Sequence, residues 1–226
     1  MNPIIVALDL PTAADARTIV STLGDAADFY KVGLELYAAA GMDFVRELKA
    51  QGKRVFLDLK LYDIGEQVKR AIAVISASGV DFLTVHAVNQ VMRAAAAGRG
   101  SSLELLAVTV LTSFDEQDVR DDGSALPLAG LVEKRVNHAL AAGMNGIVCS
   151  SLEVAKVRAM TGPKMKLVIP GVRSPGKSTG DQKRVATPAD AIASGADYLV
   201  IGRQITRAEN PREELHKILD EIHVCK

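Results

Sequence analysis

Short apolar segments alternate with helical patterns along the whole chain. The segments that resemble buried strands lie at Ile4–Leu10, Phe29–Leu36, Arg54–Leu61, Phe82–Ala87, Leu105–Thr112, Gly146–Ser150, Leu167–Val172 and Tyr198–Gly202. The segments with helical spacing of apolar residues lie at Ala13–Leu23, Met42–Gln51, Ile64–Ser78, Val91–Gly98, Leu126–Ala142, Leu152–Thr161, Thr187–Ser194 and Arg212–His223. This alternation predicts an α/β fold, a closed (β/α)8 or TIM barrel, with an open doubly wound sheet as the alternative.

The composition is typical of one globular domain over residues 1–226, since 48% of the residues are hydrophobic. The 27 Lys and Arg residues balance 27 Asp and Glu residues, which argues against a nucleic-acid-binding surface. No run reaches the ~18 apolar residues that would span a membrane, and the first residues lack a signal-peptide pattern. We therefore expect a cytoplasmic protein with neither nucleic acid nor membrane as a partner.

The segment Arg54–Gln67, RVFLDLKLYDIGEQ, combines an apolar strand with charged residues at its end. Asp58 and Lys60 are two residues apart, so both side chains should project from the same side of the strand, together with Phe56. Removing a charge from water costs several kcal/mol, roughly, unless its partners are well placed. A structural ion pair is one interpretation of this pattern, and a functional site is the other.

Other strand ends favour the functional site. In both parallel architectures, functional residues gather where strands end. The polar residues at these ends are Asp9, Lys31, Asp58, Lys60, His86, Thr112, Ser113, Ser150, Arg173 and Arg203. The alternating charges from the first three strands predict an active site.

His86 reads as a core residue, because a lone imidazole at a strand end is more often that than a ligand. His138, His216 and His223 lie on predicted helices and read as surface groups. Cys149 and Cys225 lack the spacing of a zinc site or a disulfide framework, and no His or Cys pair has metal-ligand spacing. The sequence therefore calls for no metal and no cofactor.

Residues 171–178, GVRSPGKS, match the pattern of a nucleotide phosphate loop. We reject that interpretation, because such a loop must run directly into a helix, whereas Gly180 and Pro188 interrupt the sequence that follows. The segment still supplies glycines and the donors Arg173, Lys177 and Gln182, and Gly202–Arg203 ends the last strand. In (β/α)8 barrels, the loops after strands seven and eight commonly bind phosphate.

With these motifs assembled, the chain resembles the orotidine 5'-monophosphate decarboxylase family nearly from end to end. The resemblance is carried by ALD, FYKVGLEL, VFLDLKLYDI, VHA, LLAVTVLTS, IPGVR, GDQKRVATPADAI and ADYLVIGRQIT. It implies a homodimeric decarboxylase that makes uridine monophosphate and CO2 from a nucleotide substrate in pyrimidine synthesis.

The resemblance also implies roles for individual residues. Asp9 would contact the ribose, Lys31 would form part of the catalytic charged array and hold a ribose hydroxyl, and Thr112 would contact the pyrimidine ring. Asp58 and Lys60 would face the reacting carbon, and Asp63 would enter the neighbouring subunit's active site. The residues that would hold the loop and the phosphate are Arg173, Gln182, Gly202 and Arg203.

The chemistry itself indicates what Lys60 should do. Loss of CO2 leaves an electron pair on a ring carbon with no adjacent carbonyl to delocalise it, so the protein must stabilise it electrostatically. We predict that the Lys60 ammonium stabilises and then protonates this carbon. Asp58 and Asp63 should keep Lys60 charged.

The chain departs from the family pattern after Asp63, where it reads Asp-Ile-Gly-Glu-Gln in place of Asp-Ile-Pro-Asn-Thr. Gln67 therefore replaces a threonine that helps to bind ribose. Gly65 favours, slightly, a sister group of Mg-dependent 3-keto-L-gulonate 6-phosphate decarboxylases and hexulose phosphate synthases. Lys31 opposes that alternative, because the sister group generally has a metal-binding Glu there. A non-catalytic sensor of a phosphorylated metabolite is a third hypothesis.

Overall fold

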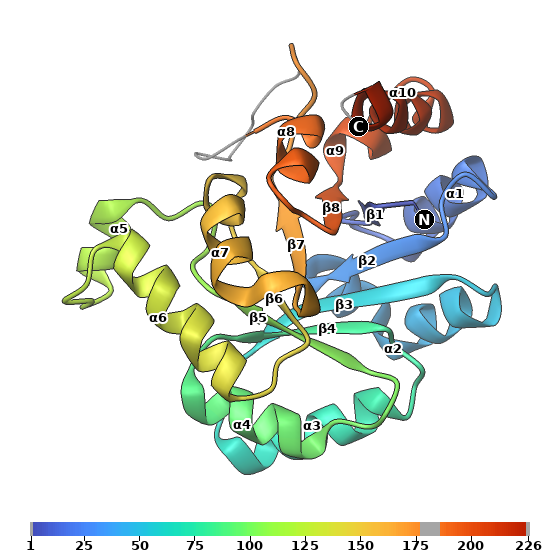
Figure 1. Ribbon diagram of the computed structural model, residues 1–226. Coiled ribbons are helices and arrows are strands. Elements are labelled where there is room, and N and C mark those ends of the chain that lie inside the picture. Colours follow the sequence, from blue (N-terminus) through green and yellow to red (C-terminus); the bar gives the residue numbers. More distant parts are fainter. Residues whose placement is uncertain (1, 177–185, 225–226) are drawn as a thin grey trace.

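Eight parallel strands close into a barrel in a computed structural model that describes residues 2–176 and 186–224 (Figure 1). The strands are β1 Ile4–Ala7, β2 Phe29–Gly33, β3 Arg54–Leu61, β4 Phe82–His86, β5 Glu104–Val108, β6 Gly146–Val148, β7 Lys166–Pro170 and β8 Tyr198–Ile201. Each strand pairs with the next, and β1 pairs with both β2 and β8. The prediction of a closed (β/α)8 barrel is confirmed, and the open-sheet alternative is wrong.

Helices cover the outside of the barrel (Figure 1). They are α1 Ala13–Leu23, α2 Leu34–Ala50, α3 Gly65–Ser76, α4 Asn89–Gly98, α5 Glu116–Asp121, α6 Leu128–Ala141, α7 Val154–Thr161, α8 Pro188–Ala193, α9 Arg203–Thr206 and α10 Pro211–Val224. Two 3-10 turns, η1 Ser151–Glu153 and η2 Gly162–Lys164, flank α7. Within the described part of the chain, no helix is long and apolar enough to cross a membrane.

Local sequence explains most helix boundaries. The Thr12 hydroxyl accepts a hydrogen bond from the Asp15 amide at 3.1 Å and so caps the start of α1. Asp115 and Asp118 form a reciprocal capping box at the start of α5, a short helix that the sequence left undecided. The buried side chains of α3, Val68, Ile72 and Ile75, form the stripe that helical periodicity predicted.

The second strand and helix differ most from prediction. β2 ends at Gly33, not at Leu36, and α2 begins at once with Leu34. Gly41 has φ 60° and ψ −160°, so α2 is kinked there, and the predicted helix was its second half. The segment LELY is apolar enough to read as strand, yet only Leu36 among its residues is buried. The short helix α9 was not predicted.

The core has two parts. Inside the barrel lie Ile5, Ala7, Phe29, Phe56, Phe82, Leu106, Val108, Val148, Val168, Tyr198 and Val200. Alternate strand residues, such as Val55 and Leu57, point outward and pack in the larger cluster between barrel and helices. Phe56 thus lies on the inner side, as the two-residue periodicity of the third strand predicted.

The N-terminal ends of the strands are closed by cations with well-defined partners. The Arg54 guanidinium lies 3.9 Å from the centroid of the Phe29 ring. Lys166, the first residue of β7, pairs with Glu104, the first residue of β5. This end of the barrel is therefore filled by rings and ion pairs.

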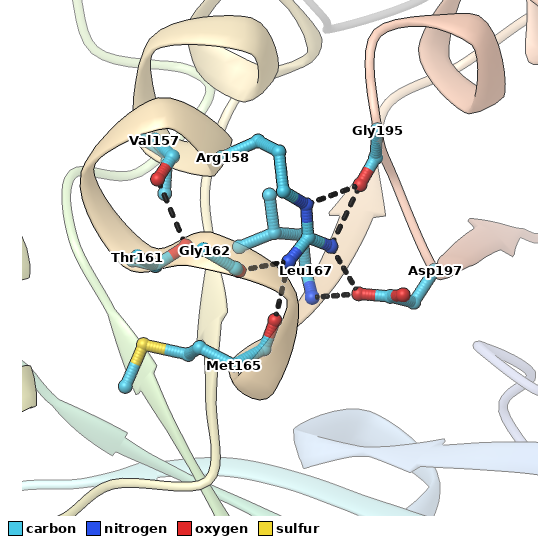
Figure 2. Close-up of polar contacts among 8 residues, drawn as sticks. All are labelled: Val157, Arg158, Thr161, Gly162, Met165, Leu167, Gly195 and Asp197. Atoms are coloured by element: carbon cyan, nitrogen blue, oxygen red, sulfur yellow. Dashed lines mark hydrogen bonds and ion pairs between the residues drawn. The ribbon is translucent and has the colours of Figure 1, made fainter.

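A single arginine joins three elements at the same end (Figure 2). Arg158 in α7 donates to the carbonyl oxygens of Gly162 at 2.6 Å, Met165 at 2.8 Å and Gly195 at 2.8 Å. It also forms an ion pair with Asp197, whose carboxylate accepts the Leu167 amide at 2.7 Å. Arg158 therefore links α7 to the beginnings of β7 and β8.

Candidate active site at the carboxyl ends of the strands

A cavity of about 750 Å³ opens where the strands end, on the side opposite Arg54 and Lys166. Its floor includes the barrel-core residues Phe56, Val108, Val148 and Val200. Its walls include the predicted site residues Asp9, Lys31, Asp58, Lys60, Thr112, Arg173, Gly202 and Arg203. A volume of this order suits a ligand of nucleotide size.

Four charges of alternating sign line one wall of the cavity. The Lys31 Nζ lies 2.6 Å from Asp9 Oδ1 and 3.7 Å from Asp58 Oδ2. The Lys60 Nζ donates to both carboxylate oxygens of Asp58, each at 2.9 Å. The structure thus brings together the four charges that the sequence placed on three strands.

These charges differ in their access to the cavity. The side chain of Lys31 is 9% exposed and that of Asp58 is 13% exposed, whereas that of Lys60 is 35% exposed. The Lys60 ammonium is therefore anchored on one side by Asp58 and open on the other to a bound ligand.

Burial of Asp58 opposes its ionisation, but the nearby cations outweigh this effect. The charges of Lys31 and Lys60, with hydrogen bonds from Lys60 and Thr84, lower the pKa of Asp58 below its ordinary value. Asp58 is consequently a carboxylate at neutral pH and forms ion pairs with both lysines.

The strand is irregular at this point. Leu57 pairs with Leu83, but the next pair joins Leu61 to Val85, so β3 contains a bulge over residues 58–60. Lys60 has φ 48° and is the one described non-glycine residue with positive φ. This backbone conformation breaks simple alternation and aims the Lys60 side chain into the cavity.

Gly33 leaves room for the charged wall. A Cβ atom at this position would lie 2.6 Å from Asp9 Oδ1 and 2.7 Å from Lys31 Nζ. Both distances are shorter than real Cβ contacts, so a larger residue here would have to displace the side-chain end of Asp9 or Lys31.

Arginines gather at the ends of β7 and β8. Arg173 follows β7, Arg203 begins α9, and both line the cavity together with Gly202 and Arg207. The Arg173 amide donates to the Ala186 carbonyl at 3.1 Å, which brings together the described ends of the intervening loop. Gln182 and Lys177 lie outside the described residues, so their predicted roles stay predictions.

Asp63 and Gln67 do not line the cavity of their own chain. Both are exposed, and Asp63 Oδ1 accepts the Ile64 amide at 2.6 Å. Gln67 Oε1 accepts a hydrogen bond from Arg70 at 3.3 Å. The roles predicted for them in a neighbouring subunit stay predictions.

Sequence reasoning missed several residues of the site. Glu35 and Arg207 line the cavity. Glu35 is in the first turn of α2, which was predicted as part of the second strand, and Arg207 follows the unpredicted helix α9, so neither was singled out. His86, predicted as a core residue, is half-buried and also lines the cavity, with its ring 5.8 Å from the Tyr62 ring. Burial, then the charges of Arg135 and Lys60, lower the pKa of His86, so its imidazole is neutral at pH 7.

No cluster of three or more metal-binding His, Cys, Asp or Glu side chains occurs in residues 2–176 and 186–224. The space between Asp9 and Asp58, where two carboxylates could hold a cation, is occupied by the Lys31 ammonium.

The fold and the cavity together define a (β/α)8 barrel with a charged ligand site at the carboxyl ends of its strands. Residues 2–218 match the family described as "Orotidine 5'-phosphate decarboxylase / HUMPS family". The chain belongs to this family.

Individual relatives agree with this assignment. The chain is 51% identical over 219 residues to the orotidine 5'-phosphate decarboxylase of Methylorubrum populi, covering 97% of this chain and 94% of that protein. It is 50% identical over 223 residues to the protein of the same name from Afipia carboxidovorans, covering 98% and 95%. The crystal structure of orotidine 5'-phosphate decarboxylase from Lactobacillus acidophilus superposes with a TM-score of 0.87 at 37% identity, covering 98% and 99%.

Proposed function

We propose that this protein decarboxylates orotidine 5'-monophosphate to uridine 5'-monophosphate and CO2, a step of pyrimidine nucleotide synthesis. Family membership and about half-identical relatives of this name support the activity. The observation that carries the mechanism is the Lys60 ammonium, which is held 2.9 Å from both Asp58 oxygens and faces the cavity.

Lys60 supplies the chemistry in this proposal. When the bond between the ring carbon and the carboxylate breaks, its electron pair stays on the carbon and CO2 leaves. The adjacent ammonium stabilises that charge and then donates a proton to the carbon, which leaves a neutral amine that water reprotonates. Asp58 keeps Lys60 charged and in place beforehand, and Lys31 balances the negative charge of Asp9.

The remaining residues hold the ribose, the ring and the phosphate of the nucleotide in this proposal. Asp9 and Lys31 contact the ribose, Thr112 contacts the pyrimidine ring, and Arg173, Gln182, Gly202 and Arg203 hold the loop and the phosphate. Arginine can hold a phosphate through two parallel charge-assisted hydrogen bonds. Binding of the remote phosphate then positions the ring against Lys60 and helps to exclude water.

The protein acts as a homodimer in this proposal, with Asp63 of each subunit completing the charged wall of the other. Two observations support this arrangement. Asp63 is exposed, and its exposed neighbours in sequence, Tyr62 and Ile64, are apolar. Leu34, beside the cavity, is a third exposed apolar side chain. Gln67, in the first turn of α3, is four residues after Asp63, and we assign it a weaker contact with the ribose across the same interface. Location in the cytoplasm stays a prediction.

The sister group is not favoured. Its Mg-dependent reactions need a cation near the position that the Lys31 ammonium occupies, and two cations so close together repel each other.

The experiment is a decarboxylation assay with purified, EDTA-treated protein, in which the absorbance of orotidine monophosphate is followed. We expect loss of the substrate without added metal. Activity on a sugar phosphate only with Mg²⁺ would support the sister group instead, and tight nucleotide binding without turnover would support a sensor.

A further inference from the structure

A threonine that the sequence did not single out lies behind the charged wall. Thr84 in β4 is completely buried, at 0% exposed. Its hydroxyl accepts the Lys60 backbone amide at 2.9 Å and donates to Asp58 Oδ1 at 2.8 Å. It does not line the cavity, so it contacts the site only through these two residues.

The bulge in β3 explains why a hydroxyl is needed there. Between the pairs Leu57–Leu83 and Leu61–Val85, β3 advances by four residues and β4 by two. The Lys60 amide therefore finds a side-chain acceptor in place of a strand carbonyl. A buried amide without an acceptor is strongly unfavourable, and the φ of 48° at Lys60 adds strain that the surroundings must compensate.

The Thr84 hydroxyl has a single proton, so the direction of each of its two hydrogen bonds is determined. Because Thr84 Oγ1 accepts from the Lys60 amide, its own proton is available for Asp58. Asp58 Oδ1 in turn accepts from the Lys60 ammonium at 2.9 Å. The contacts form a closed ring that fixes the backbone of Lys60, the carboxylate of Asp58 and the ammonium of Lys60 relative to one another.

We infer that Thr84 is a positioning residue for decarboxylation, whose hydroxyl sets the left-handed backbone of Lys60 and the orientation of Asp58. The inference rests on the proposed function. A purely structural role, in which Thr84 fills space beneath the cavity, would depend on its methyl group as much as on its hydroxyl.

Two substitutions separate these roles. Thr84→Ser and Thr84→Ala both lose the methyl group, and only the serine keeps the hydroxyl. We expect Thr84→Ser to retain kcat within about threefold, whereas Thr84→Ala lowers kcat by about ten- to a hundredfold, the effect of misplacing a reacting group by about 1 Å. The KM for orotidine monophosphate should change little in both, because the assigned phosphate and ribose contacts come from other strands.

The pH profile gives a second readout that a space-filling role would not move. The hydrogen bond from Thr84 helps to lower the pKa of Asp58, alongside the charges of Lys31 and Lys60. His86 is the other titratable group that faces Asp58 and Lys60. Losing this hydrogen bond raises the pKa of Asp58. The acid limb of kcat/KM should therefore lie at higher pH in Thr84→Ala than in Thr84→Ser, with the substrate phosphate contributing equally to both.

Equal kcat values and superimposable pH profiles for the serine and alanine variants would overturn the inference while leaving the proposed function intact. Wild-type protein without orotidine monophosphate turnover would instead overturn the proposed function. If Thr84→Ala does not fold, Thr84→Val takes its place against wild type, because valine keeps the volume and lacks the hydroxyl. A valine variant as active as wild type would refute the role of the hydroxyl just as directly.

Discussion

The two ends of the barrel both concentrate charge, but they use it differently. At the N-terminal end, Arg54 lies over aromatic rings and Lys166 pairs with Glu104. At the carboxyl end, Lys31 and Lys60 share Asp58 at the wall of a cavity of about 750 Å³. The first arrangement completes its interactions within the protein, whereas the second leaves an ammonium facing a ligand space.

The comparison shows that a charge at a strand end is not by itself a sign of function. Lys60 and Lys166 each have a carboxylate partner, and each side chain is 35% exposed. What distinguishes Lys60 is the crowding of a second lysine on the same carboxylate, a strained backbone and an adjacent cavity. Substitutions at the two ends should therefore separate activity from stability.

The largest effect is expected for Lys60→Ala. In the proposed mechanism this change removes the proton donor and the main stabilising charge, so kcat should fall by at least about a thousandfold. Binding of uridine monophosphate, measured by calorimetry, should survive, because the residues proposed to hold the phosphate follow other strands, β7 and β8. The matched control is Lys166→Ala, which should leave kcat unchanged. Near-normal turnover by Lys60→Ala would remove this residue from the mechanism.

Arg158→Ala should have the largest effect on stability at the other end. It leaves the carbonyl groups of Gly162, Met165 and Gly195 without their shared donor (Figure 2). We expect a loss of about 2–4 kcal/mol in the free energy of unfolding by denaturant titration. The kcat of the folded variant should be unchanged.

The surface pair of Arg46 and Asp43 provides the control for Arg158. Arg46→Ala breaks an exposed i,i+3 ion pair and should change stability by less than about 0.5 kcal/mol. Equal losses for the two arginines would show that the network in Figure 2 contributes no more than a surface contact.

Arg54→Met tests the aromatic closure of the barrel. The guanidinium lies near the rings of Phe29, Phe82 and Tyr198, so its removal should destabilise the protein by about 1–2 kcal/mol. Arg54→Lys retains a cation and should recover part of the loss. A large change in kcat on Arg54→Met, with stability preserved, would contradict the division of roles between the ends.

The smallest effect is expected in the titration of His86. Burial, Arg135 and Lys60 lower its pKa, so the imidazole should stay neutral to a lower pH than the ordinary value of about 6.5. Because the unfolded chain would bind this proton first, His86 should reduce stability as the pH falls through that ordinary value. NMR titration, assigned with His86→Gln, measures the pKa directly. In Lys60→Ala the pKa of His86 should rise, and an unchanged value would show that the charged wall does not act on it.

The sequence predicted the barrel well, because eight apolar segments and eight helical patterns repeat a single local rule. The errors in strand and helix boundaries arose where the same apolar residues are compatible with a strand and with a helix. Leu34–Leu36 reads as a continuation of the second strand, and the helical pattern before Gly41 was hidden by that extension. The kink at Gly41 depends on tertiary packing, which a local pattern does not contain.

The site was predictable where charges interrupt apolar strands, as at Asp9, Lys31, Asp58 and Lys60. Thr84 could not be found in this way, since a threonine within a strand is ordinary and its importance depends on the bulge opposite. The bulge in β3 could not be predicted from the sequence either. Simple alternation places Asp58 and Lys60 on one side of the strand, but it does not reveal the left-handed backbone of Lys60.

Gly33 has a consequence for how this enzyme can vary. Its φ of −92° is open to any amino acid, so backbone preference alone would permit replacement. A Cβ atom at position 33 would nevertheless meet the carboxylate of Asp9 and the ammonium of Lys31, so Gly33→Ala should displace one or both groups and lower activity relative to wild type. The space beside this ion pair thus constrains position 33 more than its backbone does.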